Sequence, residues 1–309
     1  MSSADIDRLR DFGYRQQFDS ALAISSAAIA TSPSDPAGYY WQAAVLQLLI
    51  NDSGRGALAD SLYALSDRAV ALCQQRLAKD PDDTQARLYL GLTQLNRASF
   101  LAWQQKAVAA FRICLSVGPH LSAALARDSS LADARLGLGT IEYFRAMSSR
   151  YTLGLRLTGS RKKAYALIRP LAVGRGPLNA AAQFVMVYML KEDGGCDSAV
   201  AYCRRLLATY PGNRNALRMM RDAYYKAGRD SEAVRVGARI DSALTMVYRD
   251  NKYGTAENWM MCGKAYARMG QKREARERFD RVIAWEPYKN SVPWLSKFVR
   301  EAKQWRKKL

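Results

Sequence analysis

The stretch from Asn258 to Pro287 constrains the fold of this 309-residue chain more than any other part of it. Its first half places small and aromatic residues three and four apart, on one face of a helix: Trp259, Cys262, Gly263 and Tyr266. After a turn at 269–271, a second helix repeats the spacing: Ala275, Phe279 and Val282. Gly263 and Ala275 are small enough to let two helices approach closely, and Pro287 ends the second one. The stretch therefore predicts a pair of packed antiparallel helices.

This pattern resembles the tetratricopeptide repeat (TPR), a helix-turn-helix unit of about 34 residues that stacks into a superhelix. The signature places of the repeat are held by Trp259, Gly263, Tyr266, Ala275, Phe279 and Pro287, and Cys262 stands where a leucine is usual. The resemblance implies an all-α fold, a right-handed superhelical solenoid of antiparallel helix pairs. It also implies a non-enzymatic role, because such repeats usually bind partners.

The resemblance extends over residues 1–309, which we expect to form a single solenoid. It is strong over 180–287 and weaker over 36–174, where the chain looks like bacterial TPR proteins with long, irregular central repeats. We expect irregular N-terminal repeats at 1–128, a central repeat with a long basic loop at 129–176, regular repeats at 177–288 and a C-terminal capping helix at 289–309. The expected helices are 5–14, 18–30, 37–50, 58–78, 84–96, 100–126, 132–146, 161–173, 178–191, 196–210, 215–227, 231–248, 258–268, 272–286 and 292–308. Two breaks are expected as well, at Gly118-Pro119 inside 100–126 and at Gly254 before the last regular pair.

The chain is strongly basic, with 47 Lys and Arg against 28 Asp and Glu and a net charge of +19. Such a charge attracts anionic partners, which include acidic protein segments, anionic lipid headgroups and nucleic acids. The alternative is a proteome or compartment that favours Arg. Net charge alone does not choose between these explanations.

Residues with catalytic or metal-binding chemistry are scarce. His120 is the only histidine, the five cysteines include no CxxC pair, and Gly137-Leu138-Gly139 lacks the strand and third glycine of a dinucleotide site. We therefore expect no catalytic residue, metal, cofactor or small-molecule substrate. The cysteines are expected to be reduced packing residues, which favours a reducing compartment.

The sequence leaves the compartment open. No run of about 18 apolar residues is apparent, so we expect no membrane-spanning helix. The start of the chain lacks an apolar signal core. As written, the sequence predicts a cytoplasmic protein, or a periplasmic one if an export signal has been removed.

One candidate site is a basic patch in the middle of the chain. No Asp or Glu occurs from Tyr143 to Lys191. The patch consists of Arg145, Arg150, Arg156, Arg161, Lys162 and Lys163, and apolar residues alternate with cations in the loop 147–163. Such a surface suits an acidic peptide or an anionic membrane. Acids of neighbouring repeats such as Glu142 could instead neutralise it.

The second candidate site is the concave face, which the first helix of each pair lines in such solenoids. The register places on it Phe184, Tyr188, Lys191, Asn215, Arg218, Asp222, Tyr225, Lys226, Met260, Lys264 and Arg268, and all but Asp222 are predicted to bind the partner. Cations can pair with acids, while Tyr and Asn bond a peptide backbone. Met260 and Asp222 stand where the carboxylate clamp of some TPR proteins needs Lys and Asn, so that clamp is not reproduced.

Together these features predict a protein-protein interaction scaffold or adaptor that binds an acidic or extended protein segment in its concave groove. A peripheral membrane adaptor that uses the loop 147–163 is the first alternative, and a nucleic-acid-binding repeat protein is the second. The sequence is also compatible with a homo-oligomer. The identity of the partner is not encoded in any motif.

Overall fold

The computed structural model of the chain describes residues 1–147, 159–247 and 251–309. These residues form α-helices and short 3-10 helices, and they contain no strand. Consecutive helices pack against each other in pairs, for example α5 with α6, α11 with α12 and α13 with α14. The prediction of an all-α fold of helix pairs is therefore confirmed.

The chain divides into two compact units. Unit 1 consists of Met1–Leu48 and Leu58–Met186, and unit 2 consists of Leu49–Ala57 and Val187–Leu309. The borders predicted at 128, 176 and 288 fall between helices, whereas the two units divide inside α3 and α9. The short segment Leu49–Ala57 thus packs with residues far from it in sequence.

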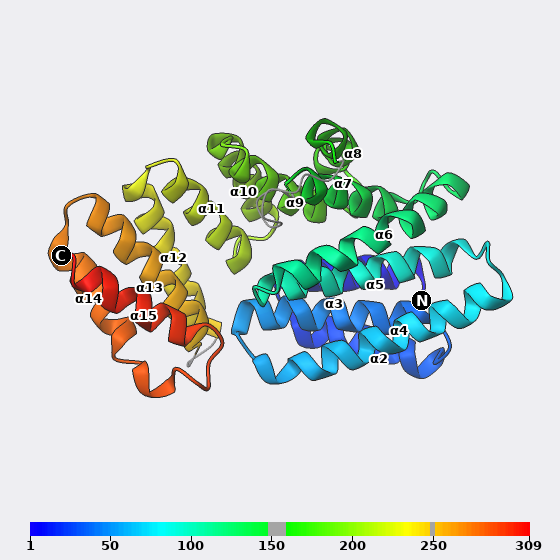
Figure 1. The fold of residues 1–309 in the computed structure, drawn as a ribbon, viewed down its shortest axis with the longest axis horizontal. Coiled ribbons are helices and arrows are strands. Elements are labelled where there is room, and N and C mark those ends of the chain that lie inside the picture. The colour runs from blue at the N-terminus through cyan, green and yellow to red at the C-terminus, as the bar shows by residue number, and fades with distance from the viewer. Residues whose placement is uncertain (148–158, 248–250) are drawn as a thin grey trace. The chain divides into compact units, whose positions relative to one another are not determined.

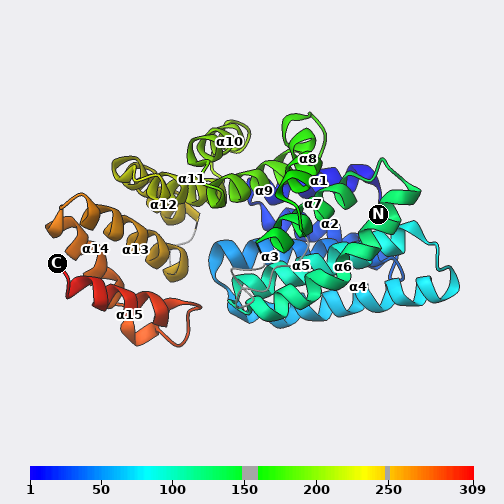
Figure 2. The ribbon, with the colours of Figure 1, turned by 45° about the horizontal axis from the view of Figure 1, so that its top comes forward.

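Unit 1 contains the N-terminal helices, of which α4, α5 and α6 are the longest that the structure describes. They are α1 (Ser3–Arg15), α2 (Phe18–Thr31), most of α3 (Pro36–Ser53), α4 (Ala59–Lys79), α5 (Thr84–Trp103), α6 (Ala107–Arg127), α7 (Ala132–Ala146), α8 (Arg161–Val173) and most of α9 (Asn179–Glu192). Figures 1 and 2 show α4, α5 and α6 side by side, in agreement with their packing.

Unit 2 contains the regular helices and the C-terminal cap. They are α10 (Cys196–Thr209), α11 (Arg214–Lys226), α12 (Asp230–Val247), α13 (Lys252–Arg268), α14 (Lys272–Ile283), a 3-10 turn at Glu286–Tyr288 and α15 (Leu295–Arg306). The helix α15 packs on α13 and α14, as the capping helix predicted at 289–309 would. In this unit the expected helices agree with the observed ones to within about three residues at each end, except that α13 begins at Lys252 and not at residue 258.

Polar side chains determine where several helices begin. Asp83, Ser160 and Asn213 each accept a hydrogen bond from the backbone N–H three residues later, at 2.9, 3.1 and 2.8 Å. Each bond satisfies a donor that the first turn of a helix leaves unpaired. These caps explain why α5, α8 and α11 start at Thr84, Arg161 and Arg214.

The turns inside the pairs need a left-handed residue. Gly194, Gly228 and Gly270 take this conformation, with φ of 87°, 75° and 75°, at no cost from a Cβ atom. In unit 1 the same place is held by Gln16 and Gln105, with φ of 59° and 60°. The turns of the regular repeats are therefore unstrained, whereas the turns at Gln16 and Gln105 place a side-chain-bearing residue in the left-handed region.

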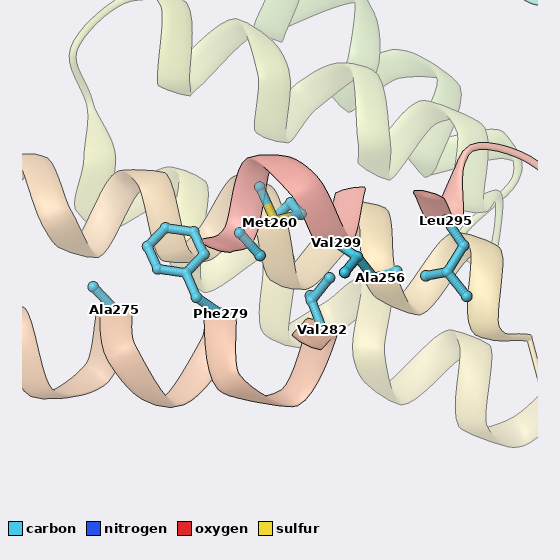
Figure 3. Close-up of a cluster of buried hydrophobic side chains, with 8 residues drawn as sticks. Ala256, Met260, Ala275, Phe279, Val282, Leu295 and Val299 are labelled. Carbon is cyan, nitrogen blue, oxygen red and sulfur yellow. The ribbon is translucent and has the colours of Figure 1, made fainter. Parts of the chain in front are cut away.

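The core of the last pair confirms the packing predicted for 258–287. Phe279 of α14 is fully buried and faces Met260 of α13 (Figure 3). A Cβ atom on Gly263 would lie 2.7 Å from the Phe279 ring, which explains why this position is glycine. Burial of one such side chain stabilises the fold by about 1.5–3 kcal/mol.

One helix start and two predicted breaks were wrong. The helix predicted at 100–126 begins only at Ala107, because α5 continues to Trp103 and buries Phe100. Pro119 does not interrupt α6, since Gly118 before it has no Cβ to clash with the proline ring and Pro119 itself is exposed. Gly254 does not break the chain either, and lies inside α13.

The expectation about membrane-spanning segments also needs correction. Among the described residues, the helix α6 is long and apolar enough to cross a membrane by length and composition. It packs against α5 in unit 1 and buries Cys114, Val117 and Leu121. All five cysteines are buried free thiols; core positions were predicted for four of them, Cys73, Cys114, Cys203 and Cys262.

Candidate functional site

The candidate site is the first-helix face of unit 2. We use this name for the surface formed by α11, α13 and the end of α9, together with the segment Leu49–Ala57. Most residues of the predicted concave face lie on these helices. The segment Leu49–Ala57 was missed, because its sequence indicated only an insertion after a helix at 37–50, whereas α3 continues to Ser53.

Asp52 is the centre of the contacts between this segment and the helices. Its carboxylate accepts two hydrogen bonds from Arg214 Nε at 3.0 Å and one from Arg214 Nη2 at 2.5 Å. Both side chains are almost fully buried, with 3% and 5% exposed. The planar guanidinium group can bond both oxygens of a carboxylate at once, so this geometry selects an acidic residue.

The backbone beside Asp52 is bound as well. Arg218 donates to the carbonyl oxygens of Asn51 and Asp52, both at 3.1 Å. Asn251 Nδ2 donates to the carbonyl of Asp52 at 2.9 Å. Two arginines and one asparagine therefore bind a carboxylate and two peptide carbonyls in the last turn of α3. Of these three residues, only Arg218 was predicted to bind, and recognition of an acidic partner segment stays a prediction.

Local structure prepares this arrangement. Asn251 caps the start of α13 by accepting from Gly254 N at 2.8 Å, and this fixes its amide for the bond to Asp52. A Cβ atom on Gly254 would lie 2.6 Å from Arg218 Nη2, so the glycine makes room for the guanidinium. Gly54 has φ of +69° and passes close to Tyr253. Gly254, which the sequence indicated as a break, is thus required for the packing of Arg218 against α13.

A second buried cation on this face was also missed. The Arg221 side chain is only 1% exposed and contacts Asp222 at 2.8 Å and Glu257 at 2.7 Å. It also donates to Asn258 Oδ1 at 2.9 Å. Burial alone would lower the pKa of Arg221, but the two carboxylates raise it above its ordinary value. The network holds α11 against α13.

The remaining predicted cations of this face are paired too. Lys226 lies 3.5 Å from Glu192, and Lys264 lies 2.8 Å from Glu301 of α15. Arg268 bonds Asp230, and its guanidinium lies 3.6 Å from the centre of the Tyr225 ring. Lys191 is 3.9 Å from Glu192 and 5.9 Å from the Tyr188 ring.

These pairs change the expected charge of the face. The cations Lys191, Arg214, Arg218, Arg221, Lys226, Lys264 and Arg268 pair with the acids Asp52, Glu192, Asp222, Asp230, Glu257 and Glu301, of which Asp230 lies on α12 and Glu301 on α15. These seven cations are therefore largely compensated, which the sequence did not indicate. The sequence could not show this, because most pairs join different helices.

Three predicted residues do not belong to the exposed part of the face. Arg218 is 8% exposed, and its guanidinium donates to the carbonyl oxygens of Asn51 and Asp52. Met260 is 2% exposed and packs in the core with Phe279, so it cannot line a groove. Phe184 lies in unit 1, where it stacks on Tyr14 at 5.9 Å. Asn215 and Lys226 are exposed, so they stay available to a partner.

The predicted basic patch is only partly described. Arg150 and Arg156 lie outside the described residues. Lys163 contacts Glu142 at 2.9 Å, so a neighbouring acid neutralises one of its cations. Arg161 donates to the Met147 sulfur at 3.1 Å, and Lys162 is exposed. The role of the patch in binding stays a prediction.

Comparison with known proteins places the fold among helical-repeat proteins. PilW, described as a widely conserved type IV pilus biogenesis factor, is 19% identical, with a TM-score of 0.52 over 78% of this chain and 94% of PilW. The Cut9–Hcn1 structure of the APC/C is 14% identical, with a TM-score of 0.57 over 94% of this chain and 47% of that one. A tetratricopeptide repeat protein from Parabacteroides merdae is 14% identical, with a TM-score of 0.47 over 98% of this chain and 97% of its own.

No family model and no curated protein sequence matches the chain. The fold and the paired helices define an all-α helical-repeat protein. Within that class, the signature positions and the packing of α13 and α14 are those of the tetratricopeptide repeat fold.

Proposed function

We propose that this chain is a protein-interaction scaffold, and that the first-helix face of unit 2 binds an extended, acid-bearing segment of a partner protein. The observation that carries the proposal is the binding of Asp52. Arg214, Arg218 and Asn251 bind the buried carboxylate of Asp52 and two neighbouring carbonyl groups in the last turn of α3. A face that binds one such segment has the chemistry to bind another.

The partner would bind beside the Asp52 contacts, along α11. Asn215 and Lys226 are exposed on this helix and sit at its two ends. The Lys226–Glu192 pair at 3.5 Å is half exposed, and such pairs contribute only about 0–1 kcal/mol. A partner carboxylate can therefore replace Glu192 as the neighbour of Lys226 at little cost. Asn215 offers an amide that can bond the partner's backbone.

Selection of peptides on the immobilised full chain tests the proposal. A displayed library of random peptides should yield binders enriched in Asp and Glu. The double variant Asn215→Asp, Lys226→Glu should lose these binders, because it adds negative charge at two exposed positions without touching the core. The matched control is Arg239→Glu, Ser242→Asp on α12, where both residues are exposed and the change in net charge is the same.

The outcomes separate clearly. Loss in the α11 variant with retention in the α12 control supports binding on this face. Binders without acidic enrichment, or equal binding by both variants, would rule out the proposed class of partner and its site.

A further inference from the structure

The excess positive charge of unit 2 lies away from the first-helix face. Residues 272–309 contain twelve Lys and Arg but only five Asp and Glu. This segment forms α14, which is the second helix of the last repeat, followed by the 3-10 turn and α15 (Figure 1). A net positive charge of this size on two neighbouring helices needs an anionic partner or a solvent-exposed position.

The outer side of α14 concentrates this charge. Its exposed residues, with Arg306 of α15, line a shallow concavity: Lys272, Arg273, Arg276, Glu277, Asp280, Arg281, Ala284 and Arg306. The two acids are already paired, Glu277 with Arg281 at 2.6 Å and Asp280 with Arg306 at 2.9 Å. Lys272 and Arg273 make no ion pair within the described part of the chain. The exposed Glu274 lies in the same turn, so the start of α14 keeps a net positive charge from Lys272 and Arg273 against one acid.

Aromatic rings extend the same surface. Arg281 lies 5.5 Å from the Trp259 ring, which stacks on Trp285 at 4.8 Å. Lys252 lies 4.6 Å from the ring of Tyr288, which is 49% exposed. Arg281 thus joins the basic concavity to a row of partly exposed rings. We call the combined set the α14 surface: Lys272, Arg273, Arg276, Arg281, Arg306, Trp259, Trp285 and Tyr288.

We propose that the α14 surface docks on an anionic membrane. Cations near a membrane of anionic lipids each add attraction, and Trp and Tyr rings favour the boundary between headgroups and acyl chains. The surface is shallow and is formed by several elements, which suits a broad, laterally extended ligand better than a single bound group. This inference goes beyond the scaffold function and rests on different residues.

Flotation of the full chain with lipid vesicles tests the inference. Vesicles of phosphatidylcholine mixed with phosphatidylglycerol should carry the protein, and vesicles of phosphatidylcholine alone should not. The variant Lys272→Glu, Arg273→Glu should lower partition onto the anionic vesicles by about thirtyfold or more, since each cation near such a surface contributes about 1 kcal/mol. Tyr288→Ala should also lower it, through loss of an aromatic contact.

The control variant is Arg235→Glu, Arg239→Glu, which changes the net charge equally at two exposed positions of α12. Binding that persists in this control and fails in the α14 variant supports the inference. Equal loss in both variants would show a response to net charge alone and would overturn it. So would absence of lipid-dependent flotation, or binding of soluble polyglutamate or RNA in its place.

Discussion

Replacement of Asp52 by Ala should destabilise unit 2 strongly. The substitution removes the carboxylate that accepts three hydrogen bonds from Arg214. The Arg214 side chain is 5% exposed, so a positive charge loses its main partner in a place that water hardly reaches. Removal of one partner from a buried ion pair costs about 3–5 kcal/mol, mainly because the other charge stays buried. We expect a loss in this range, since the bonds of Arg218 and Asn251 to backbone carbonyls can persist.

Urea unfolding of the full chain, followed by the Trp fluorescence and by circular dichroism, measures this loss. Asp60→Ala is the control, because this acid on α4 is exposed and its removal should change the free energy of unfolding by less than about 0.5 kcal/mol. The double variant Asp52→Ala, Arg214→Met should be more stable than Asp52→Ala alone, since it also removes the buried charge that lost the Asp52 carboxylate. A loss below about 1 kcal/mol for Asp52→Ala, or no recovery in the double variant, would refute the reasoning.

Three further predictions follow from turns, packing and titration. Gln105→Gly should raise the free energy of unfolding by up to about 1 kcal/mol in urea, because Gln105 has φ of 60° and glycine adopts this conformation without strain; no gain would show that the turn is not strained. Gly237→Ala should lower the melting temperature, because its Cβ would meet the Cys262 sulfur and overpacking costs about 1–3 kcal/mol, while Gly212→Ala, with open space around it, should change little. Burial raises the pKa of Cys203 from 9.0 to about 12, so the folded chain keeps a proton that the unfolded chain loses, and stability should fall as the pH rises above about 9. The variant Cys203→Ala should show a smaller fall in the same urea titrations, and an equal fall would contradict this assignment.

The regular pairs could be predicted because their packing is local in sequence. Gly263 and Phe279 are sixteen positions apart, and the contact between them follows from the known geometry of one helix pair. The same holds for the turn at Gly270, where the positive φ of 75° needs glycine. Helical spacing and turn chemistry depend on residues that are close in sequence, so both can be recognised in a single sequence.

The Asp52 contacts could not be predicted for the opposite reason. Asp52 and Arg214 are 162 positions apart, and the segment around Asp52 has the composition of an ordinary loop. Gly254 was interpreted as a break because glycine weakens helices, whereas its role is to admit the guanidinium of Arg218. The charge of the first-helix face was overestimated for the same cause: Lys264 and its partner Glu301 lie on different helices. A signal in the sequence that could have helped is the placement of charged residues such as Arg221 at positions of α11 that the helical register assigns to the core.

The most direct test of the scaffold function is a titration of the full chain with one selected acidic peptide and with the same peptide carrying Asn and Gln in place of Asp and Glu. Fluorescence anisotropy at constant ionic strength reports both affinities. The account predicts that the acidic peptide binds at least about tenfold more tightly than its amide form, since hydrogen bonds to charged groups contribute about 1.5–3 kcal/mol. It also predicts that the variant Asn215→Asp, Lys226→Glu removes this preference. Equal affinity for the two peptides, or an unchanged preference in the variant, would contradict recognition of an acidic segment on the first-helix face.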